Sequence, residues 1–562
     1  MAAPAGGHPT QTHPLQLIPL GGLGEFGMNM MALRHGDAIL VVDTGLMFPD
    51  ETHHGVDFIV PDMTRLFELP GSLGGVILSH GHDDHIGALP YLFQKTRAPV
   101  YGSRLTLGLA RKRLDEHQIA LDDGMLNVVA PGQVVTCGPF TIEFIHVTHS
   151  IPDALAVAIR TPAGLVVHTA DFKMDQTPVD ELRFDLQRFA QLGDEGVLAL
   201  LSDSTNASRP GFTPSERTVG LALEPLMRAA RGRVVVTTFA SNIHRIQQVV
   251  DVAVGMGRKV ALTGRSMMGN VEIAREMGYL HVPEGCLIEG RDVSKYPAPE
   301  IVILASGSQG EPMSSMARIA LDRHSDVSIE RGDLVILSAR RIPGNEVGIS
   351  RMVNHLCRRG ADVLLDDTPG IHVSGHASRE ELKLMIALTR PRYFVPIHGD
   401  FQHLSQHARL AREMGLPEER VLLAETGDMI EITPESASIT GKMPVGSVFI
   451  DGRFDEVDEM VIRDRQHIAA DGVIMPIVVI NKHTGEVESP PEMLTRGFVW
   501  TQDEEGLFRE AGLVVMESIT DSSLEERADN GFIRTRIVAD LKRFMRKRTR
   551  KRPLIIPVVM EV

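Results

Sequence analysis

The chain has few cysteines. Cys137, Cys286 and Cys357 are its three cysteines, and no two of them form a Cys-x-x-Cys pair. Their odd number and wide spacing argue against a disulfide framework and against a cysteine-based metal site. We therefore interpret all three as small buried hydrophobic residues of a protein in a reducing compartment.

Long apolar segments are also missing. The sequence contains no uninterrupted apolar run that could cross a bilayer, and its start has neither the basic region nor the apolar region of a secretory signal. We expect a cytoplasmic protein with no membrane partner. Residues 1–14, rich in proline, glycine, threonine and histidine, are predicted to form a disordered tail.

The chain has no excess of positive charge. Its formal net charge of −16 argues against a general affinity for nucleic acid, because clustered lysine and arginine are needed to neutralise phosphate groups. A polyanionic substrate would have to be attracted by metal ions and by local basic patches. One such patch, residues 542–552, holds eight cationic residues in eleven positions. It is either the solvated end of a helix or a segment that attracts RNA.

The length of 562 residues predicts several domains, and a hydrophobic content of 43% is typical of globular proteins. Between residues 15 and 206, short β-rich runs alternate with turns and with helical patterns at 84–94 and 104–117. This pattern predicts two sheets with helices packed outside them. The expected strands are residues 15–20, 30–33, 38–43, 76–79, 141–145, 154–159, 165–168 and 197–201.

Residues 207–369 have a different pattern. Apolar strands at 234–238, 260–263, 301–305 and 334–338 alternate with amphipathic helices at 215–230, 243–254, 266–277 and 346–359, which predicts a parallel α/β sheet. The histidine-bearing pattern resumes near residue 370. We therefore predict that 207–369 is an insertion into one discontinuous domain formed by 15–206 and 370–445.

The remaining sequence predicts a linker over residues 446–458 and a small C-terminal α/β domain over 459–562. The linker is turn-rich and acidic. The terminal domain is expected to contain a strand at 473–481, a helix around 523–548 and a closing strand at 554–559.

The most informative motif is His80-Gly81-His82-Asp83-Asp84-His85, which has the pattern His-x-His-x-Asp-His. Neutral imidazole and ionised carboxylate are ligands of zinc and similar divalent ions. The apolar run 75–79 precedes the motif and predicts a buried strand, so the ligands would lie at the C-terminal edge of a strand. A single histidine is more often structural or solvent-exposed, but four candidate ligands in six residues favour a metal site.

Further ligands must come from other strand ends, because one turn cannot complete two metal coordination shells. His149, Asp171 and His398 each follow a predicted strand, as the first motif does. Taken singly, each histidine would more often be structural. The recurrence of the same architectural position favours metal ligation.

A glycine-rich stretch near the start mimics a cofactor site. Gly22-x-Gly24-x-x-Gly27 fits the dinucleotide fingerprint and follows an apolar strand, but it leads into another strand and not into a phosphate-binding helix. We interpret it as a tight glycine hairpin beside the metal loop.

The metal motif, followed by single His, Asp and His ligands at strand ends, resembles the metallo-β-lactamase fold. The insertion, together with Ser-Asp-Ser-Thr-Asn at 202–206, Val-Ser-Gly-His-Ala-Ser at 373–378 and Pro-Ile-His-Gly-Asp at 396–400, resembles the β-CASP branch of that fold. Within this branch the chain is similar to the bacterial ribonuclease J family from about residue 15 to its end. The resemblance implies an α/β protein with a metallo-β-lactamase αββα sandwich, an inserted β-CASP α/β domain and a small C-terminal α/β domain.

The resemblance also implies a set of ligands. One divalent ion would be held by His80, His82 and His149, and a second by Asp84, His85 and His398, with Asp171 bridging them. Asp43 would orient the ligand loop from outside the coordination shell. We expect two zinc ions per subunit, with manganese or magnesium as alternatives, because the sequence does not distinguish them.

His376 is the candidate general acid for the leaving 3′ oxygen, and the resemblance places Asp203 as the residue that orients it. The alternative for His376 is a further metal or structural histidine. Asp83, in the ligand turn, is also a catalytic candidate. The expected RNA and phosphate contacts are His372, Ser374, Gly375, Ser378, Ser241, Asn242 and Arg245. The serines could instead cap helices, and Ser378 is a plausible N-cap.

The implied activity is that of a metal-dependent ribonuclease in RNA maturation and decay, which degrades RNA 5′ to 3′ from 5′-monophosphate ends and also cuts internally. The implied partners are RNA, a second or further copies in a homodimer or homotetramer, and an RNA-degradation assembly. The first alternative is a binuclear-metal hydrolase of a small thioester or lactam, which would need neither a long groove nor the set Asp203, His376 and His398. A non-catalytic RNA-binding or scaffold subunit would have lost ligands, and this sequence has lost none.

Overall fold

The structure is a computed structural model that describes residues 13–50, 52–342, 344–481, 484, 486–500, 503–527 and 529–562. The chain divides into two compact units, the first comprising Met1–Phe48 and Ile59–Ser447 and the second Pro49–Phe58 and Val448–Val562. Of the predicted tail, residues 1–12 lie outside the described residues. Within the described part of the chain, no helix has the length and apolar character needed to cross a membrane.

The first sheet of unit one holds the ligand turn. Its strand order is β23-β22-β1-β3-β4-β6-β7-β8, and β4, β6, β7 and β8 run parallel to one another. The strands are β23 (Ala437–Lys442), β22 (Asp428–Ile432), β1 (Leu15–Gly21), β3 (Met30–His35), β4 (Ala38–Val42), β6 (Ser72–Leu78), β7 (Val100–Gly102) and β8 (Leu126–Val128). Near the end of the discontinuous domain, β22 thus pairs with its first strand, β1, and β23 pairs with β22.

The second sheet supplies the other candidate ligands. Its order is β20-β13-β12-β11-β10-β9, with β12, β13 and β20 parallel. The strands are β20 (Tyr393–Ile397), β13 (Val197–Asp203), β12 (Gly164–His168), β11 (Leu155–Thr161), β10 (Phe140–His146) and β9 (Val134–Cys137). Alternate side chains of the two sheets, such as Leu17 and Leu33 from the first and Phe144 and Val157 from the second, form one buried core between them.

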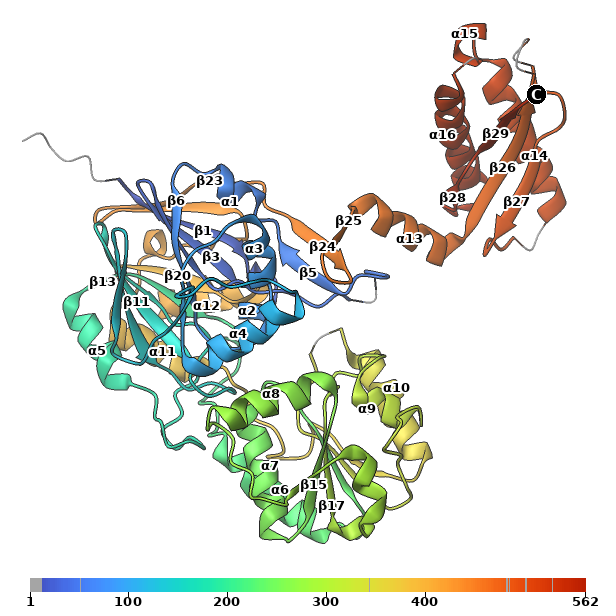
Figure 1. Ribbon diagram of the computed structural model, residues 1–562. Helices are drawn as coiled ribbons and strands as arrows, with labels where there is room; N and C mark the ends of the chain where they lie inside the picture. The colour runs from blue at the N-terminus through green and yellow to red at the C-terminus, as the bar shows by residue number, and fades with distance from the viewer. Residues whose placement is uncertain are drawn as a thin grey trace, which may run out of the picture. The chain divides into compact units, whose positions relative to one another are not determined.

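Helices cover the outer faces of the sandwich (Figure 1). Beside the first sheet lie α1 (Thr64–Glu68), α2 (Asp83–Ile86), α3 (Leu89–Lys95) and α4 (Arg104–Glu116), and beside the second lie α5 (Leu186–Glu195), α11 (Arg379–Thr389) and α12 (Phe401–Glu413). Phe189, Leu382 and Ala408 of the latter helices pack against the second sheet. The remaining short elements are β2 (Leu23–Gly24), β21 (Gly399–Asp400), β5 (Phe58–Pro61) and η3 (Glu418–Arg420). The unit therefore has the predicted αββα architecture.

The insertion forms a parallel α/β domain, drawn green to yellow in Figure 1. Its strand order is β16-β15-β17-β14-β18-β19, with every pair parallel. The strands are β16 (Leu287–Ile288), β15 (Lys259–Thr263), β17 (Ile301–Ala305), β14 (Val234–Thr237), β18 (Leu334–Leu337) and β19 (Asp362–Leu364). The helices are α6 (Arg217–Ala229), α7 (Ile243–Gly255), α8 (Arg265–Glu276), α9 (Ser315–Ala320) and α10 (Glu346–Arg358), with η1 (Gly290–Lys295) and η2 (Ala298–Glu300).

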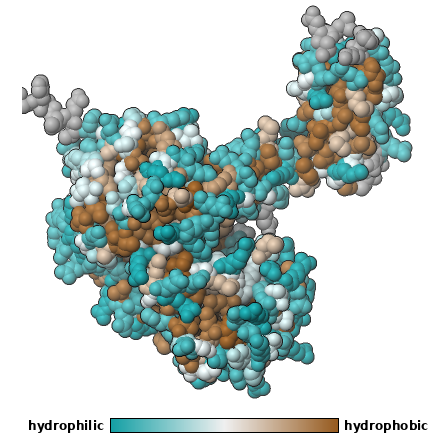
Figure 2. Space-filling model, viewed as in Figure 1, coloured by the Kyte–Doolittle hydropathy of each residue, from teal (hydrophilic) through white to brown (hydrophobic). Residues whose placement is uncertain are grey.

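Unit two has its own sheet and core. β26 (Val473–Ile480) pairs antiparallel with β27 (Glu492–Arg496) and parallel with β28 (Leu554–Ile555) and β29 (Val558–Glu561). The other elements are β24 (Ser447–Asp451), β25 (Asp455–Val457), α13 (Glu459–Asp471), α14 (Glu504–Thr520), α15 (Leu524–Arg527) and α16 (Asn530–Thr549). Val478, Val515 and Ile537 share its core. In Figure 2, apolar residues also gather on the surface of this unit, and the exposed ones include Leu494, Leu513 and Met560.

Several local expectations differ from the structure. The helix predicted at 84–94 is broken into α2 and α3, because Pro90 lies at the start of α3 and has no N–H for a bond to the preceding turn. The predicted linker contains two antiparallel strands, β24 and β25. Residues Pro49–Phe58, inside the range predicted for the first domain, cluster with unit two, where Asp57 N donates to Ile450 O (2.7 Å).

The three cysteines are free, and all lie within the described residues. Cys137 and Cys286 are buried, as expected. The expectation was wrong for Cys357, which is exposed on α10. The buried residues of that helix are Ile349, Met352 and Leu356, and position 357 lies on the outer face beside this stripe.

Candidate metal centre and active site

The ligand turn begins where β6 ends. His82 has extended backbone and is the N-cap residue of the short helix α2, which places Asp84 and His85 in its first turn. Asp43 directly follows β4, the parallel neighbour of β6, so the carboxyl ends of these two strands bring Asp43 beside the turn. Asp43 has a φ of 63°, a left-handed conformation that residues other than glycine rarely adopt.

The other candidate ligands come from the second sheet. His149 follows β10, Asp171 follows β12 and His398 follows β20, while Asp203 is the last residue of β13. Because β12, β13 and β20 are parallel neighbours, their carboxyl ends meet at one edge of the sheet. His398 also has a positive φ, 57°. Residues separated by more than 200 positions thus converge because each ends or follows a strand.

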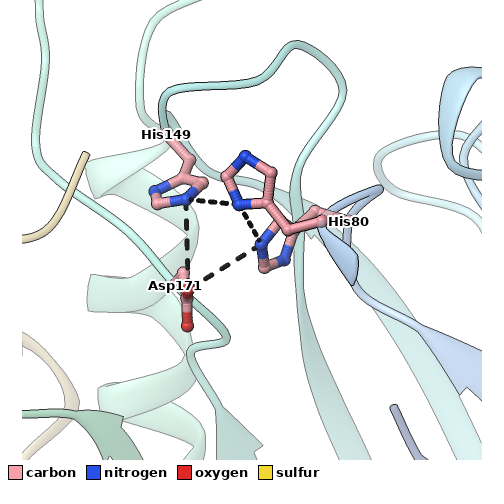
Figure 3. Close-up of side chains that lie close together, drawn as sticks. His80, His149 and Asp171 are labelled. Atoms are coloured by element: carbon pink, nitrogen blue, oxygen red, sulfur yellow. Dashed lines mark hydrogen bonds and ion pairs between the residues drawn. The ribbon is translucent and has the colours of Figure 1, made fainter. Parts of the chain in front are cut away.

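The first donor group consists of His80, His82, His149 and Asp171, whose ligand atoms all lie within 4.8 Å of one another. His82 Nδ1 lies 3.0 Å from His80 Nε2 and 3.2 Å from His149 Nε2. Figure 3 shows His80, His149 and Asp171 facing one another. Three ring nitrogens and one carboxylate oxygen therefore point into one small volume.

The second donor group consists of Asp84, His85, Asp171 and His398, again within 4.8 Å. The same oxygen, Asp171 Oδ2, lies 3.3 Å from Nε2 of both His85 and His398, and 3.7 Å from His80 Nε2. One carboxylate oxygen is thus shared by both groups. His80, His85, His149, Asp171 and His398 are buried, whereas the side chain of Asp84 is 35% exposed, so the second group opens to solvent on that side.

The histidines are oriented by hydrogen bonds on their outer nitrogens. His149 Nδ1 donates to Gly375 O (2.8 Å), and His85 Nδ1 donates to Asp43 Oδ2 (2.8 Å). His398 Nδ1 lies 2.8 Å from Thr205 Oγ1, which itself donates to Asp203 Oδ1. With the outer nitrogen protonated, the inner nitrogen carries a lone pair toward the shared volume, the arrangement that metal-binding histidines use.

The chemistry of these donors fits divalent metal ions. His398 Nε2 is buried and lies 3.3 Å from Asp171 Oδ2 and 3.5 Å from Asp84 Oδ2, but it forms no well-aligned hydrogen bond with any described residue, which is costly unless another group satisfies it. Asp43, Asp171 and Asp203 are at most 2% exposed, and buried negative charges require compensating positive charge. Both observations are explained by cations held between the two groups.

Side-chain ionisation separates the two groups. Burial lowers the pKa of His80 and His149 well below its usual range and lowers the pKa of His82 to about 4, so these imidazoles are neutral. Burial also acts on His398, but the carboxylates of Asp171, Asp84 and Asp203 outweigh it and raise its pKa to about 9. The field that retains a proton on His398 would equally favour a metal cation there.

His376 lies beside the donor groups and pairs with Asp203. His376 Nδ1 donates to Asp203 Oδ2 (2.8 Å), and Asp171 Oδ2 is 4.0 Å away. Burial opposes protonation of His376, but Asp203 and Asp171 outweigh it and raise its pKa. An imidazolium whose Nδ1 proton is held by Asp203 has its Nε2 proton left to donate, as a general acid requires.

The loop that carries His376 packs closely on the ligands. A Cβ on Gly375 would lie 2.7 Å from His149 Cε1, so only glycine allows its carbonyl to accept from His149. Ser374 Oγ accepts from Asn206 Nδ2 (2.9 Å), and His372 is partly buried. Ser378 forms a capping box with Glu381 at the start of α11, as the helix-cap interpretation anticipated.

Not every predicted site residue joins this arrangement. The carboxylate of Asp83 accepts bonds from Nε (2.9 Å) and Nη2 (2.6 Å) of Arg113 on α4, and it belongs to neither donor group. We therefore do not assign Asp83 to the reacting centre. Asn242 Oδ1 accepts from Arg245 N and caps α7, while Ser241 is only partly buried.

Arg245 is fully buried, so its guanidinium contacts protein and not RNA. Its Nε donates to Glu216 Oε1 (2.6 Å), and its Nη1 donates to Ser338 O (2.8 Å). Ser338 Oγ in turn donates to Ile371 O (2.6 Å). Glu216 Oε2 also lies 3.5 Å from Lys173 Nζ, two residues after Asp171. This buried network ties the inserted domain to both the ligand segment and the His376 loop.

Sequence reasoning missed several residues that support the site. Thr205 holds His398, Ser79 N and Oγ both donate to Asp43, and Asn206 donates to Ser374 Oγ and His376 O. Asn29 Nδ2 donates to Asp84 Oδ2 (3.3 Å). Thr205 and Asn206 lie inside the Ser-Asp-Ser-Thr-Asn motif at 202–206 that the sequence analysis had already singled out, and their polar side chains were the available signal.

Four family models match consecutive parts of the chain. The metallo-β-lactamase superfamily matches residues 23–196, and the ribonuclease J β-CASP domain matches 231–356. The Zn-dependent metallo-hydrolase RNA specificity domain matches 370–423, and the ribonuclease J C-terminal domain matches 460–562. The first and third models contain all the candidate ligands.

Known proteins are similar over nearly the full length. Ribonuclease J of Thermus thermophilus is 42% identical over 554 residues, which cover 97% of this chain and 95% of that protein. Ribonuclease J of Helicobacter pylori is 40% identical over 96% of this chain and 79% of its own length, and ribonuclease J2 of Bacillus subtilis is 38% identical over 98% and 99%.

A crystal structure of a protein of unknown function from Enterococcus faecalis V583 has a TM-score of 0.51 at 16% identity, covering 75% of this chain and 100% of that one. This likeness supports the fold alone. The identities, the matched models and the shared-carboxylate donor groups lead to one conclusion: the chain belongs to the ribonuclease J family of metallo-β-lactamase-fold metallo-hydrolases.

Proposed function

We propose that the chain is a metal-dependent ribonuclease that hydrolyses RNA phosphodiester bonds 5′ to 3′ from 5′-monophosphate ends and also cuts internally. The observation that carries this proposal is one carboxylate, Asp171, shared by two donor groups directly beside the His376–Asp203 pair. The relatives named ribonuclease J support RNA as the substrate.

The two donor groups would hold two divalent ions per chain. The family description of a Zn-dependent metallo-hydrolase favours zinc, with manganese and magnesium as alternatives. One ion would be held by His80, His82 and His149. The other would be held by Asp84, His85 and His398, and Asp171 would contribute to both sites. When bound, such ions stabilise charge on a phosphoryl oxygen and lower the pKa of water.

The chain's own residues would then supply the proton that the leaving group needs. Hydrolysis of an RNA phosphodiester releases the 3′ oxygen of the upstream nucleotide, which needs a proton. His376 would donate its Nε2 proton to that oxygen, and the Asp203 carboxylate would stabilise the imidazolium through Nδ1. Asp43, through His85 and Ser79, would keep the ligand turn in place.

The loop at 371–378 would position the substrate phosphate. On this loop, Gly375 O accepts from His149, Ser374 Oγ accepts from Asn206, and His372 Nδ1 lies 3.4 Å from Arg245 Nη1 of the inserted domain. Polar side chains and backbone N–H groups contact phosphate oxygens in nucleic-acid complexes. Ser241, at the start of α7, is a further candidate contact because it is partly buried and its neighbours cap the helix.

The alternative functions lack support from this site. A hydrolase of small thioesters or lactams would need the metal groups but not the His376–Asp203 pair or the inserted domain. A scaffold subunit would not retain both donor groups. The pair and the two complete groups therefore favour catalysis on a phosphodiester.

Digestion of end-defined RNA by purified protein tests this function. RNAs that carry a 5′-monophosphate, a 5′-triphosphate or a 5′-hydroxyl group should differ in rate, with the monophosphate degraded fastest to short products. His80→Ala combined with Asp84→Ala should lose bound metal and cleavage together. His376→Gln should retain metal but lose about 10²- to 10⁴-fold in turnover, the usual contribution of a general acid.

His355→Gln, a histidine on α10 outside all donor groups, is the matched control and should cleave like wild type. The assignment is contradicted if the His376→Gln protein cleaves RNA at the wild-type rate. It is also contradicted if metal analysis of wild-type protein given excess zinc or manganese finds none bound.

Assembly into homodimers or homotetramers through unit two, and membership in an RNA-degradation assembly, remain part of this proposal. The exposed apolar side chains of unit two, which include Leu494, Leu513 and Met560, support a contact between copies. Light scattering of wild type and of Leu494→Lys, which would place a charge on the sheet face away from α14 and α16, tests it. The cytoplasmic location stays a prediction.

A further inference from the structure

Two exposed arginines lie beside the loop that carries His376. Arg340 follows β18 at the carboxyl edge of the parallel sheet of the inserted domain, the edge at which α/β sheets bind ligands. Arg209 lies in the segment between β13 and α6, and its N–H donates to Asn206 O (2.8 Å). Both side chains are exposed. Arg209 therefore lies at the start of the inserted segment 207–369, and Arg340 lies much later in the same segment, after β18.

Neither arginine is neutralised by a carboxylate within the described part of the chain. The guanidinium of Arg340 makes one hydrogen bond, from Nη1 to Asn206 Oδ1 (3.3 Å). Its neighbour Arg341 is different, because Arg341 Nη2 lies 2.8 Å from Asp366 Oδ1. Both arginines contact the same residue, since Arg209 N donates to Asn206 O and Arg340 Nη1 donates to Asn206 Oδ1. Partial burial and then the nearby charge of Arg340 lower the pKa of Arg209.

Asn206 connects this pair of cations to the reacting centre. Its Oδ1 accepts from Arg340, and its Nδ2 donates to Ser374 Oγ (2.9 Å) and to His376 O (3.0 Å). The guanidinium of Arg340 is thus separated by a single side chain from the backbone of the general acid. On the other side, Arg379 N donates to Arg209 O (2.9 Å), which fixes the segment of Arg209 against the start of α11.

Guanidinium groups bind phosphate through parallel N–H···O bonds, and two of them side by side match the charge of one phosphate group. The chain as a whole carries a net charge of −16, so a polyanion needs local cations at the place of reaction. His372, on the same loop, is neutral because burial, with Arg245 next in effect, lowers its pKa to about 3. The arginines therefore supply the positive charge on this side of the loop.

We infer that Arg209 and Arg340 together form a binding site for one phosphate group of the RNA beside the His376 loop. This inference rests on the proposed ribonuclease function. The phosphate is either the 5′-terminal monophosphate or an internal phosphodiester, which share the chemistry that the arginines recognise.

Binding of a short fluorescent RNA, measured at several salt concentrations, tests the site. The RNA is used with a 5′-monophosphate and with a 5′-hydroxyl group, in a His376→Gln background so that it stays intact. Arg340→Gln and Arg209→Gln should each weaken binding about tenfold, the effect of losing a charge-assisted hydrogen bond. Each should also reduce the slope of log K against log salt by about 0.7. Arg341→Gln, whose partner is Asp366, is the matched control and should change neither quantity.

The same binding measurements test whether the two arginines hold one phosphate together and identify which phosphate it is. If both arginines hold one phosphate, the double variant loses less affinity than the product of the single effects. A loss confined to the 5′-monophosphate RNA assigns the site to the terminal phosphate, and an equal loss for both RNAs assigns it to an internal one. Arg340→Lys should restore the salt slope and only part of the affinity, because lysine keeps the charge but not the paired donors.

Two results would overturn the inference. One is an Arg340→Gln protein with the affinity and salt slope of Arg341→Gln. The other, measured with His376 present, is an unchanged affinity with a changed kcat and pH profile, which would mean that Arg340 only positions the loop through Asn206. The proposed ribonuclease function fails separately, if wild-type protein neither binds nor cleaves these RNAs.

Discussion

The outer nitrogens of the candidate ligand histidines show how single residues orient the donor groups. These nitrogens point away from the donor groups, and their hydrogen bonds fix the direction of each ring. The partners are Gly375 O for His149, Asp43 for His85 and Thr205 for His398. Such contacts outside the coordination shell set both the tautomer and the basicity of the ligand. Their removal should therefore weaken metal binding without removing a ligand.

Asp43→Asn is the sharpest variant for this idea. It keeps a residue type that tolerates the φ of 63°, but an amide cannot match the carboxylate that accepts from His85 and Ser79. We expect zinc affinity to fall about 10- to 100-fold, measured by competition with a chromophoric chelator. Asp37→Asn, an exposed aspartate in the turn between β3 and β4, should have the wild-type affinity.

His407 predicts a pH dependence of stability. It is fully buried against Phe394, and burial lowers its pKa to about 3. Its pKa in the unfolded chain is near 6.5, so between about pH 6.5 and 3 the unfolded state binds a proton that the folded state does not. This residue should therefore destabilise the fold as pH falls through that window, by about 1.4 kcal/mol per pH unit, and should have no effect above it.

Urea unfolding of chelator-treated protein at pH 7 and pH 5 checks this. Between these two pH values, the free energy of unfolding of His407→Gln should fall by roughly 2 kcal/mol less than that of wild type, since glutamine has no group that titrates there. His355→Gln, which is not fully buried, should follow wild type. Equal losses in all three proteins would show that His407 does not titrate as inferred.

At the scale of elements, strand ends rather than sequence neighbours assemble the site. The motif at 80–85 and the single residues His149, Asp171 and His398 could be predicted because each polar side chain follows an apolar run. Thr205 and Asn206 lie in a recognisable motif, but their contacts and those of Glu216 could not be predicted, because the partners lie far away in the sequence, as with Asn206 and His376 at a separation of 170 residues. Such hydrogen bonds exist only once the domains have packed.

The same limit explains the missed helix α14. Its sequence contains Gly506, Gly512 and the β-branched pair Val514-Val515, which are weak helix formers. Leu507, Ala511, Val515 and Ile519 are buried, and all except Leu507 share one core with α16 and β26. Tertiary packing therefore stabilises a helix whose local sequence signal is weak.

The buried ion pair between α6 and α7 gives a prediction at this scale. Arg245→Met leaves the buried Glu216 with Lys173 at 3.5 Å as its one cation among the described residues and a long bond of 3.4 Å from Gln248 Nε2, and breaking one partner of a buried pair costs about 3–5 kcal/mol. We expect the urea midpoint of the first unit to fall accordingly. The double variant Arg245→Met with Glu216→Leu should recover most of the loss, because no unpaired charge remains.

Arg265→Met, an exposed arginine at the start of α8, is the control for this series and should be nearly neutral. The network also predicts an effect on catalysis. The single variant Arg245→Met should lose turnover, because Ser338 loses its bond to Arg245 and no longer holds the His376 loop in place. A fully stable Arg245→Met protein would contradict the assigned role.

At the scale of the whole molecule, all donor groups lie in the first unit. The second unit has a separate core built from β26, α14 and α16. A ligand that binds only the folded state stabilises it, by about 4 kcal/mol when free ligand is 1,000 times the dissociation constant. Chelation should therefore destabilise one unit and leave the other unchanged.

Differential scanning calorimetry with and without EDTA measures this. We expect two transitions, of which one shifts to lower temperature on chelation and returns when zinc is added back. His80→Ala with Asp84→Ala should melt like the chelated protein and should not respond to zinc. Equal shifts of both transitions would contradict the placement of every metal ligand in the first unit.

The order of the ligands along the chain has a consequence for synthesis. His80 emerges early from the ribosome, but His398 and the strand β22, which pairs with β1, follow only after the entire inserted domain. A nascent chain therefore cannot complete the centre until most of its own message has been read. Until His398 has emerged, a nascent chain is therefore unable to attack the transcript that encodes it.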